Sequence, residues 1–131
     1  MKLLSIALFL SLTCFSQERH IDFTQVLYGV DGKPLQSPDA KNTKGLTLGE
    51  AAMAALVAPL EEDKGMAGAE KFKLEELARK VYSSKNAHLT VEDIALIKTR
   101  IGKAYGPLVV GPAWRLLDPE VEKAKEPKGT K

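Results

Sequence analysis

The segment that most constrains this fold is a run of eight apolar residues, 51–58, which reads Ala-Ala-Met-Ala-Ala-Leu-Val-Ala. As a helix it is apolar all round, so it must be buried on more than one side, and its alanines let neighbouring helices approach closely. Thr47 and Glu50 precede it at the spacing of a capping box, in which hydroxyl and carboxylate each satisfy a free N–H of the helix start. We therefore predict a core helix from Thr47 to about Ala58, just before Pro59.

Other helices are predicted around this core helix. One covers about residues 67–82, where Leu74, Leu77, Ala78 and Val81 form a single apolar stripe. Thr90 and Asp93 form a second capping-box pattern, which predicts the start of the next helix. The core face of that helix is formed by Ile94, Ile97, Ile101 and Tyr105. A last apolar segment runs over residues 107–117, in which Pro112 would kink or restart a helix because it lacks a backbone donor.

The N-terminal part predicts strands. Residues 20–28 are rich in β-branched and aromatic side chains, and Asp31-Gly32 follows as a hairpin signal, since both central positions of a type I′ turn need positive φ. Pro34 would place the second strand at a sheet edge. The expected fold class is mainly α (α+β), with an N-terminal β-hairpin packed on a bundle of three to four short helices.

The length of 131 residues indicates one domain. We expect a signal-peptide-like leader over residues 1–16 and the hairpin with a polar loop over residues 17–46. The helical domain covers residues 47–117 and forms one fold unit with the hairpin. A disordered tail is expected over residues 118–131.

The leader predicts export to the periplasm or outside the cell. Lys2 precedes about ten apolar residues, as in a secretory signal peptide, and this run is too short to span a bilayer, which needs about 20 residues. Ser16 supplies a small residue for cleavage before Gln17. Lipidation at Cys14 is a rival export hypothesis. Two further alternatives stay open. The apolar run is a buried N-terminal helix, or it is an extension from a misplaced start codon, in which case the protein is cytoplasmic or part of a virion.

Charge argues against nucleic acid as a partner. The formal net charge is only +2, which gives no long-range field to attract polyanions. Lys98, Arg100 and Lys103 form a basic edge on one predicted helix, but Lys98 and Arg100 are two residues apart and do not share a face.

Reactive residues are few. The only cysteine is Cys14 in the leader, so the rest of the chain has no disulfide, thiolate metal ligand or cysteine nucleophile. His20 and His88 lie far apart in the sequence without acidic or cysteine partners at ligand spacing. Neither a Gly-x-Ser-x-Gly elbow nor a glycine-rich phosphate loop is present. We predict a non-enzymatic protein without metal or cofactor, although paired carboxylates are spatial and sequence does not exclude them.

The C-terminal apolar segment is the predicted partner surface. Tryptophan and tyrosine beside arginine are favoured at interface hot spots, and so small a chain cannot bury all its apolar area. The alternative is that these side chains complete the helical core. The residues assigned to this surface are Tyr105, Leu108, Val109, Trp114, Arg115 and Leu117.

The chain resembles a group of small phage and prophage proteins of unknown function. The resemblance is carried by residues 21–27, 31–35, 46–50 and 89–114, and its most specific parts are 93–98 and 101–111. It implies a non-enzymatic accessory or assembly protein that acts through protein contacts. The chain departs from the group in its apolar leader, which conflicts with a virion or cytoplasmic role, and in Pro112.

Two functional hypotheses follow. The first is a protein-binding or assembly accessory protein in a phage-related context, with a protein partner or a homo-oligomer. The second is a secreted periplasmic or extracellular protein that binds a ligand or inhibits a host factor.

Mass spectrometry of the N-terminus after bacterial expression separates these accounts. We expect a mature chain that begins at Gln17, because Ser16 offers the small residue that signal peptidase needs. A lipid-modified Cys14 would support the rival export route. An intact Met1 would contradict export.

Overall fold

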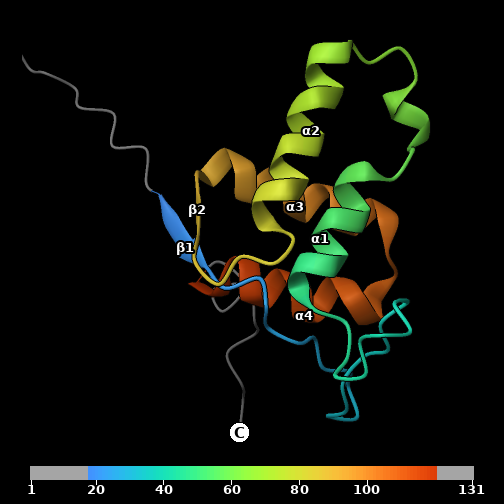
Figure 1. Ribbon diagram of the computed structural model, residues 1–131, viewed down its shortest axis with the longest axis vertical. Helices are drawn as coiled ribbons and strands as arrows, with labels where there is room; N and C mark the ends of the chain where they lie inside the picture. Colours follow the sequence, from blue (N-terminus) through green and yellow to red (C-terminus); the bar gives the residue numbers. More distant parts are fainter. Residues whose placement is uncertain (1–17, 121–131) are drawn as a thin grey trace, which may run out of the picture.

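The computed structural model describes residues 18–120 and shows a small, mainly helical α+β domain, so the predicted fold class is confirmed (Figure 1). Its elements in chain order are β1 (Arg19–Ile21), α1 (Leu48–Val57), the short 3₁₀ helix η1 (Glu61–Asp63), α2 (Gly68–Val81), β2 (Ala87–Leu89), α3 (Val91–Ala104) and α4 (Pro107–Leu117). The predicted leader, with Cys14, Ser16 and Gln17, and most of the predicted tail lie outside the described residues.

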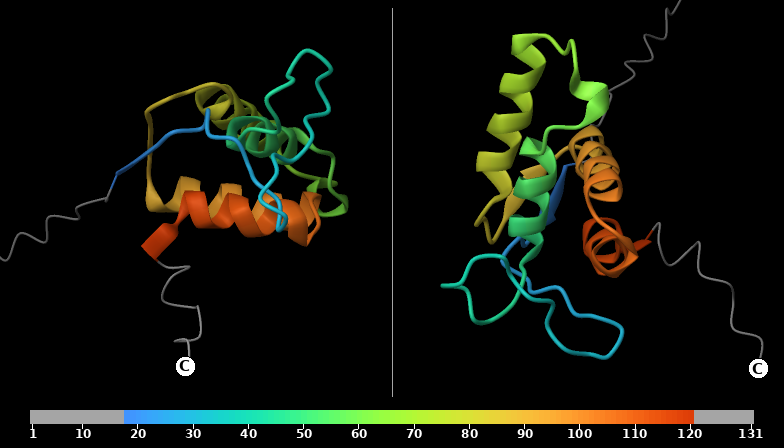
Figure 2. Two further views of the ribbon diagram at one scale, coloured as in Figure 1. Left: turned by 90° about the horizontal axis from the view of Figure 1, so that it is seen from below. Right: turned by 90° about the vertical axis from the view of Figure 1, so that its right-hand side faces the viewer.

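Helix α1 is the centre of the domain, as its all-round apolar sequence predicts. It contacts α2, α3 and α4, and Ala51, Ala52 and Ala55 have no exposed surface. Figure 2 shows α1 beside α2, with α3 and α4 together on the other side. Alanine at these positions lets the three neighbours approach one helix closely, which is how so short a chain encloses a core.

Both predicted capping boxes are present. The Thr47 hydroxyl accepts a hydrogen bond from the Glu50 N–H at 3.1 Å, and the Glu50 carboxylate accepts one from the Thr47 N–H at 3.2 Å. Thr90 and Asp93 make the same reciprocal pair at the start of α3. These local contacts fix where the two helices begin.

The sheet joins segments that are distant in the sequence. Strand β1 pairs antiparallel with β2, and Arg19, His20 and Ile21 lie opposite Leu89, His88 and Ala87. The predicted strand ends at Ile21 because the Asp22 carboxylate accepts hydrogen bonds from the Thr24 N–H and hydroxyl, at 2.8 and 2.6 Å, which turns the chain. These bonds also lower the pKa of Asp22.

A turn forms at Asp31-Gly32, but it differs from the predicted type I′ turn. Gly32 has φ of +77°, whereas no non-glycine residue in the described part of the chain has positive φ. The turn is closed by Gly29, whose N–H donates to the Lys33 carbonyl at 2.8 Å, and by a single bridge between Tyr28 and Pro34. A three-residue loop with glycine in the left-handed position explains this geometry.

Helix α4 is one continuous helix from Pro107 to Leu117 that includes Pro112. Of the two predicted effects of Pro112, a kink or a restart, the restart does not occur. Gly111 precedes the proline and has no Cβ to meet its ring, which relieves the usual steric restriction before proline.

The packing at Gly49 generates a stability prediction. A Cβ at Gly49 would lie 2.1 Å from the Tyr82 carbonyl oxygen and 3.0 Å from that of Phe23, and these backbone atoms cannot move aside as a flexible side chain can. We expect Gly49→Ala to lower the free energy of unfolding by about 3 kcal/mol, as overpacking does.

Gly68→Ala is the matched control, since Gly68 also lies in the first turn of a helix but a Cβ there meets nothing within 4 Å. This variant should be as stable as the wild type or up to about 1 kcal/mol more stable, from helix propensity. Urea denaturation measures both, and equal effects of the two substitutions would contradict the packing argument.

Candidate partner-binding site

The candidate site is built on the C-terminal end of α1. Pro59 disfavours helical backbone at Ala58, which has φ of −61° and ψ of 135° and ends the helix. The last carbonyls of a helix have no partner within it. In a buried helix such as α1, these oxygens need donors from elsewhere in the chain.

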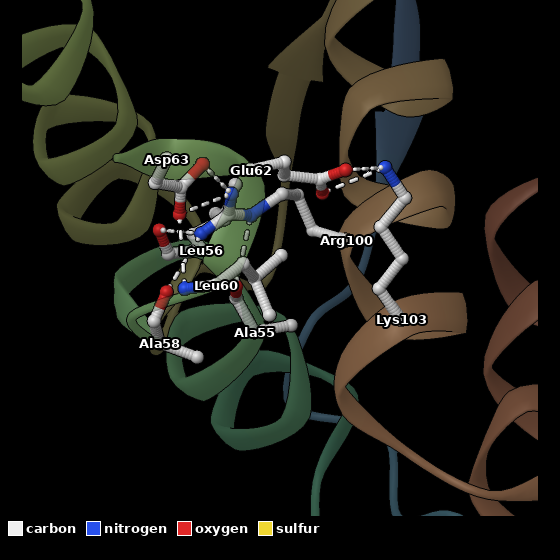
Figure 3. Close-up of polar contacts among 8 residues, drawn as sticks. All are labelled: Ala55, Leu56, Ala58, Leu60, Glu62, Asp63, Arg100 and Lys103. Carbon is white, nitrogen blue, oxygen red and sulfur yellow. Dashed lines mark hydrogen bonds and ion pairs between the residues drawn. The ribbon is translucent and has the colours of Figure 1, made fainter. Parts of the chain in front are cut away.

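Arg100 of α3 supplies those donors (Figure 3). Its Nε donates to the Ala55 carbonyl at 3.1 Å, and its Nη2 donates to the carbonyls of Leu56 and Ala58 at 3.1 and 2.9 Å. Its Nη1 donates to both carboxylate oxygens of Asp63, at 2.8 and 2.9 Å. Arg100 is only 5% exposed, so these are contacts of a buried, fully bonded guanidinium.

Asp63 links this cluster to the loop that follows α1. Its carboxylate also accepts the Leu60 N–H at 3.2 Å, and its own N–H donates to the Leu60 carbonyl at 3.0 Å, which closes η1. The Arg100 hydrogen bonds hold the pKa of Asp63 below its ordinary value. Lys103 makes a second, exposed tie from α3 to η1 through Glu62 at 2.6 Å.

An apolar groove opens beside this cluster. A pocket of about 560 Å³ lies between the end of α1, the η1 loop and α2, with Arg100 and Asp63 in its wall. Its apolar lining comprises Leu56, Val57, Ala58, Pro59, Leu60, Met66 and Leu74. A second pocket of about 260 Å³ shares Val57 and Glu75 with the first and extends to Met53 and Tyr82. We call the two together the α1–α2 groove.

The predicted partner residues in α4 are divided between core and surface. Leu117 is buried at 1% exposure, and Trp114 packs on Gly102 while its indole N–H donates to the Lys98 carbonyl at 3.1 Å. Trp114 therefore joins α4 to α3, and Leu117 belongs to the hydrophobic core.

The rest of that set lies nearer to solvent. Leu108 is 58% exposed and Arg115 is exposed, while Val109 and Tyr105 are half-buried. Burial raises the pKa of the Tyr105 phenol, and the Glu50 carboxylate adds to this effect.

The sequence predicts neither the groove nor the buried Arg100 in its wall. It places Arg100 on a basic edge, but the residue is buried in the structure. Its position three residues after Ile97, on the apolar stripe of α3, is the sequence signal for this burial. Lys98 is also engaged, with its ammonium 4.8 Å from the centre of the Trp114 ring and 4.0 Å from Asp118. The three basic residues thus have separate partners within the domain.

His20 and His88, which sequence spacing separates, lie side by side in the structure. They are far apart in the chain, but the sheet brings their ring centres to 3.9 Å. No group of three or more His, Cys, Asp or Glu side chains suited to a metal ion occurs within residues 18–120. None of the helices in the same range is long and apolar enough to span a bilayer.

Comparison with known proteins gives no relative: no family model, no curated protein and no solved structure matches this chain. The function proposed below is therefore argued from the site itself.

The Arg100 cluster generates a second stability prediction. We expect Arg100→Met to lower the free energy of unfolding by about 3–5 kcal/mol, because it leaves the Asp63 carboxylate and three carbonyls without their donor. Lys103→Met removes the exposed tie from the same helix and should cost less than about 1 kcal/mol. Urea denaturation at neutral pH measures both.

The loss of unfolding free energy caused by Arg100→Met should also depend on pH. Since the folded-state pKa of Asp63 lies below the ordinary value of 3.8, its ionised form stabilises the fold above that pH, and this contribution is lost as the pH falls through the folded-state pKa. The difference between wild type and variant should therefore shrink below pH 3.8. A difference that stays constant through this range would contradict a role for the Asp63 charge.

Proposed function

We propose that this chain is a small, non-enzymatic protein-binding module that receives an amphipathic helix of a protein partner in the α1–α2 groove. The observation behind the proposal is the pair of adjoining, mostly apolar pockets that form the groove, which lie at the surface and share Val57 and Glu75, with the hydrogen-bonded Arg100 and Asp63 in the wall of the larger one. Preformed apolar grooves with a polar rim are a recurring way to bind an amphipathic helix.

The dimensions favour a helix as the occupant. Along α2 the groove extends from Lys71 to Tyr82, which is about 16 Å at the rise of an α-helix. A partner helix of about three turns covers this length and presents apolar anchors at i, i+3 or i+4, and i+7. Val57 lies at the junction of the two pockets and is 51% exposed, so it is placed to contact the middle anchor.

The charges at the rim favour an acidic residue on that helix. Lys64 pairs with Glu61 at 2.6 Å, and Arg79 pairs with Glu75. Lys71 is exposed and makes no ion pair with any residue in the part of the chain that the structure describes. A partner carboxylate opposite Lys71 would therefore add electrostatic complementarity without displacing an existing pair.

The phage-like sequence segments support the same class of function, since they imply an accessory or assembly protein acting through protein contacts. The groove, rather than the predicted face of α4, is the preferred surface, because Trp114 is bonded to the Lys98 carbonyl of α3 and Leu117 is buried in the core. The alternative, a secreted protein that binds a small apolar ligand, would use the same groove and is separated by the experiment below.

The test selects peptides from a helix-forming library on the full chain and maps the binding of the best ones. We expect selected peptides with apolar anchors at helical spacing and an acidic residue, and we expect Val57→Lys to weaken their binding roughly tenfold or more. Leu108→Lys is the matched control, because Leu108 is a similarly exposed apolar residue on α4. It should leave the affinity unchanged.

Three outcomes would overturn the proposal. The first is a library that yields no binder, and the second is binding that depends on Leu108 rather than on Val57. The third is a small apolar ligand that fills the groove with micromolar affinity when no peptide does so. Chemical-shift mapping by NMR reports which residues the peptide contacts, and circular dichroism confirms that both variants remain folded.

A further inference from the structure

We propose that His20 and His88 form a binding site for a divalent transition-metal ion of the Zn²⁺ class on the outer face of the two-stranded sheet. The first observation is their register. The two histidines are direct partners across β1 and β2, and their ring centres lie 3.9 Å apart. Imidazole is a preferred ligand for such ions, and two imidazoles held side by side bind one ion as a chelate.

The fold forces both rings outward. Side chains alternate across a strand, and the neighbours Ile21, Ala87 and Leu89 are all buried in the core. The histidines between them must therefore face solvent, and both are exposed. An ion can reach this pair without any opening of the fold, and water can complete its coordination shell.

The second observation is the orientation of the rings. Nδ1 of His20 lies 3.0 Å from the side-chain oxygen of Asn86, to which it donates in the neutral ring. Nδ1 of His88 lies 3.9 Å from a carboxylate oxygen of Glu18, which is beyond hydrogen-bond distance. A proton held on Nδ1 of His20 leaves the lone pair of its Nε2 free to bind an ion. Histidine ligands of metal sites are oriented by the same kind of outer partner.

The site also couples metal binding to folding. The two ligands are 68 positions apart in the sequence, and only the pairing of β1 with β2 brings them together. An unfolded chain keeps two isolated imidazoles and loses the chelate. Zinc should therefore bind the folded state preferentially and stabilise it.

The experiment titrates the untagged full chain with Zn²⁺ alone by isothermal calorimetry near neutral pH. We expect one ion per chain with micromolar affinity, and we expect both His20→Asn and His88→Asn to weaken binding at least tenfold. Asn86→Ala, which removes only the orienting acceptor, should weaken it several-fold. Cys14→Ser should leave the affinity unchanged, which shows that the leader thiol does not supply the ligand.

Two further readouts make the result decisive. The Tm of the wild type should rise with Zn²⁺, while the Tm of either histidine variant should not. The ¹³C shifts of both rings should change on zinc binding, and those of His20 should report coordination through Nε2. If the single-histidine variants bind zinc as tightly as the wild type, if binding disappears with Cys14→Ser, or if the folded chain binds no zinc, the proposed site is wrong.

Discussion

The structure depends on the way that Arg100 completes the end of α1. A helix that is apolar all round has to be buried, but burial leaves its last carbonyls without water. The Arg100 guanidinium donates to three of them and uses its remaining donors on Asp63. One side chain therefore caps the end of the core helix and connects it to α3 and to η1. The wall of the α1–α2 groove is a consequence of the same contacts.

Close approach to α1 is the second constraint. Its alanines and Gly49 leave room for other backbone, and Gly49 lies against Tyr82 at the end of α2. The inner faces of α1 and α2 also bury large side chains, among them Leu56 and Val81. Val57 and other apolar residues on the outer side of α1 and α2 lie near the surface, where they line the groove.

Local patterns in the sequence predict the helices. The capping boxes at Thr47 and Thr90 mark two helix N-termini, and the apolar stripes mark the buried faces. The two proposed sites differ in how far such local patterns reveal them. Arg100 occupies a core position of its stripe, which is a local signal, but its acceptors lie more than forty residues away. The histidine pair has no local signal at all, because its two members are 68 positions apart.

The sequence by itself determined the mainly helical α+β class, the starts of α1 and α3 and the turn at Gly32, because each depends on contacts within a few residues. The all-round apolar composition of α1 also predicted its burial. Only the tertiary structure decided that β1 pairs with β2, that Arg100 binds the end of α1, and that Leu117 belongs to the core. These contacts join residues that meet only when the whole chain closes around α1. Which residues meet in them depends on burial and on the need of buried polar groups for hydrogen-bond partners, not on spacing in the sequence.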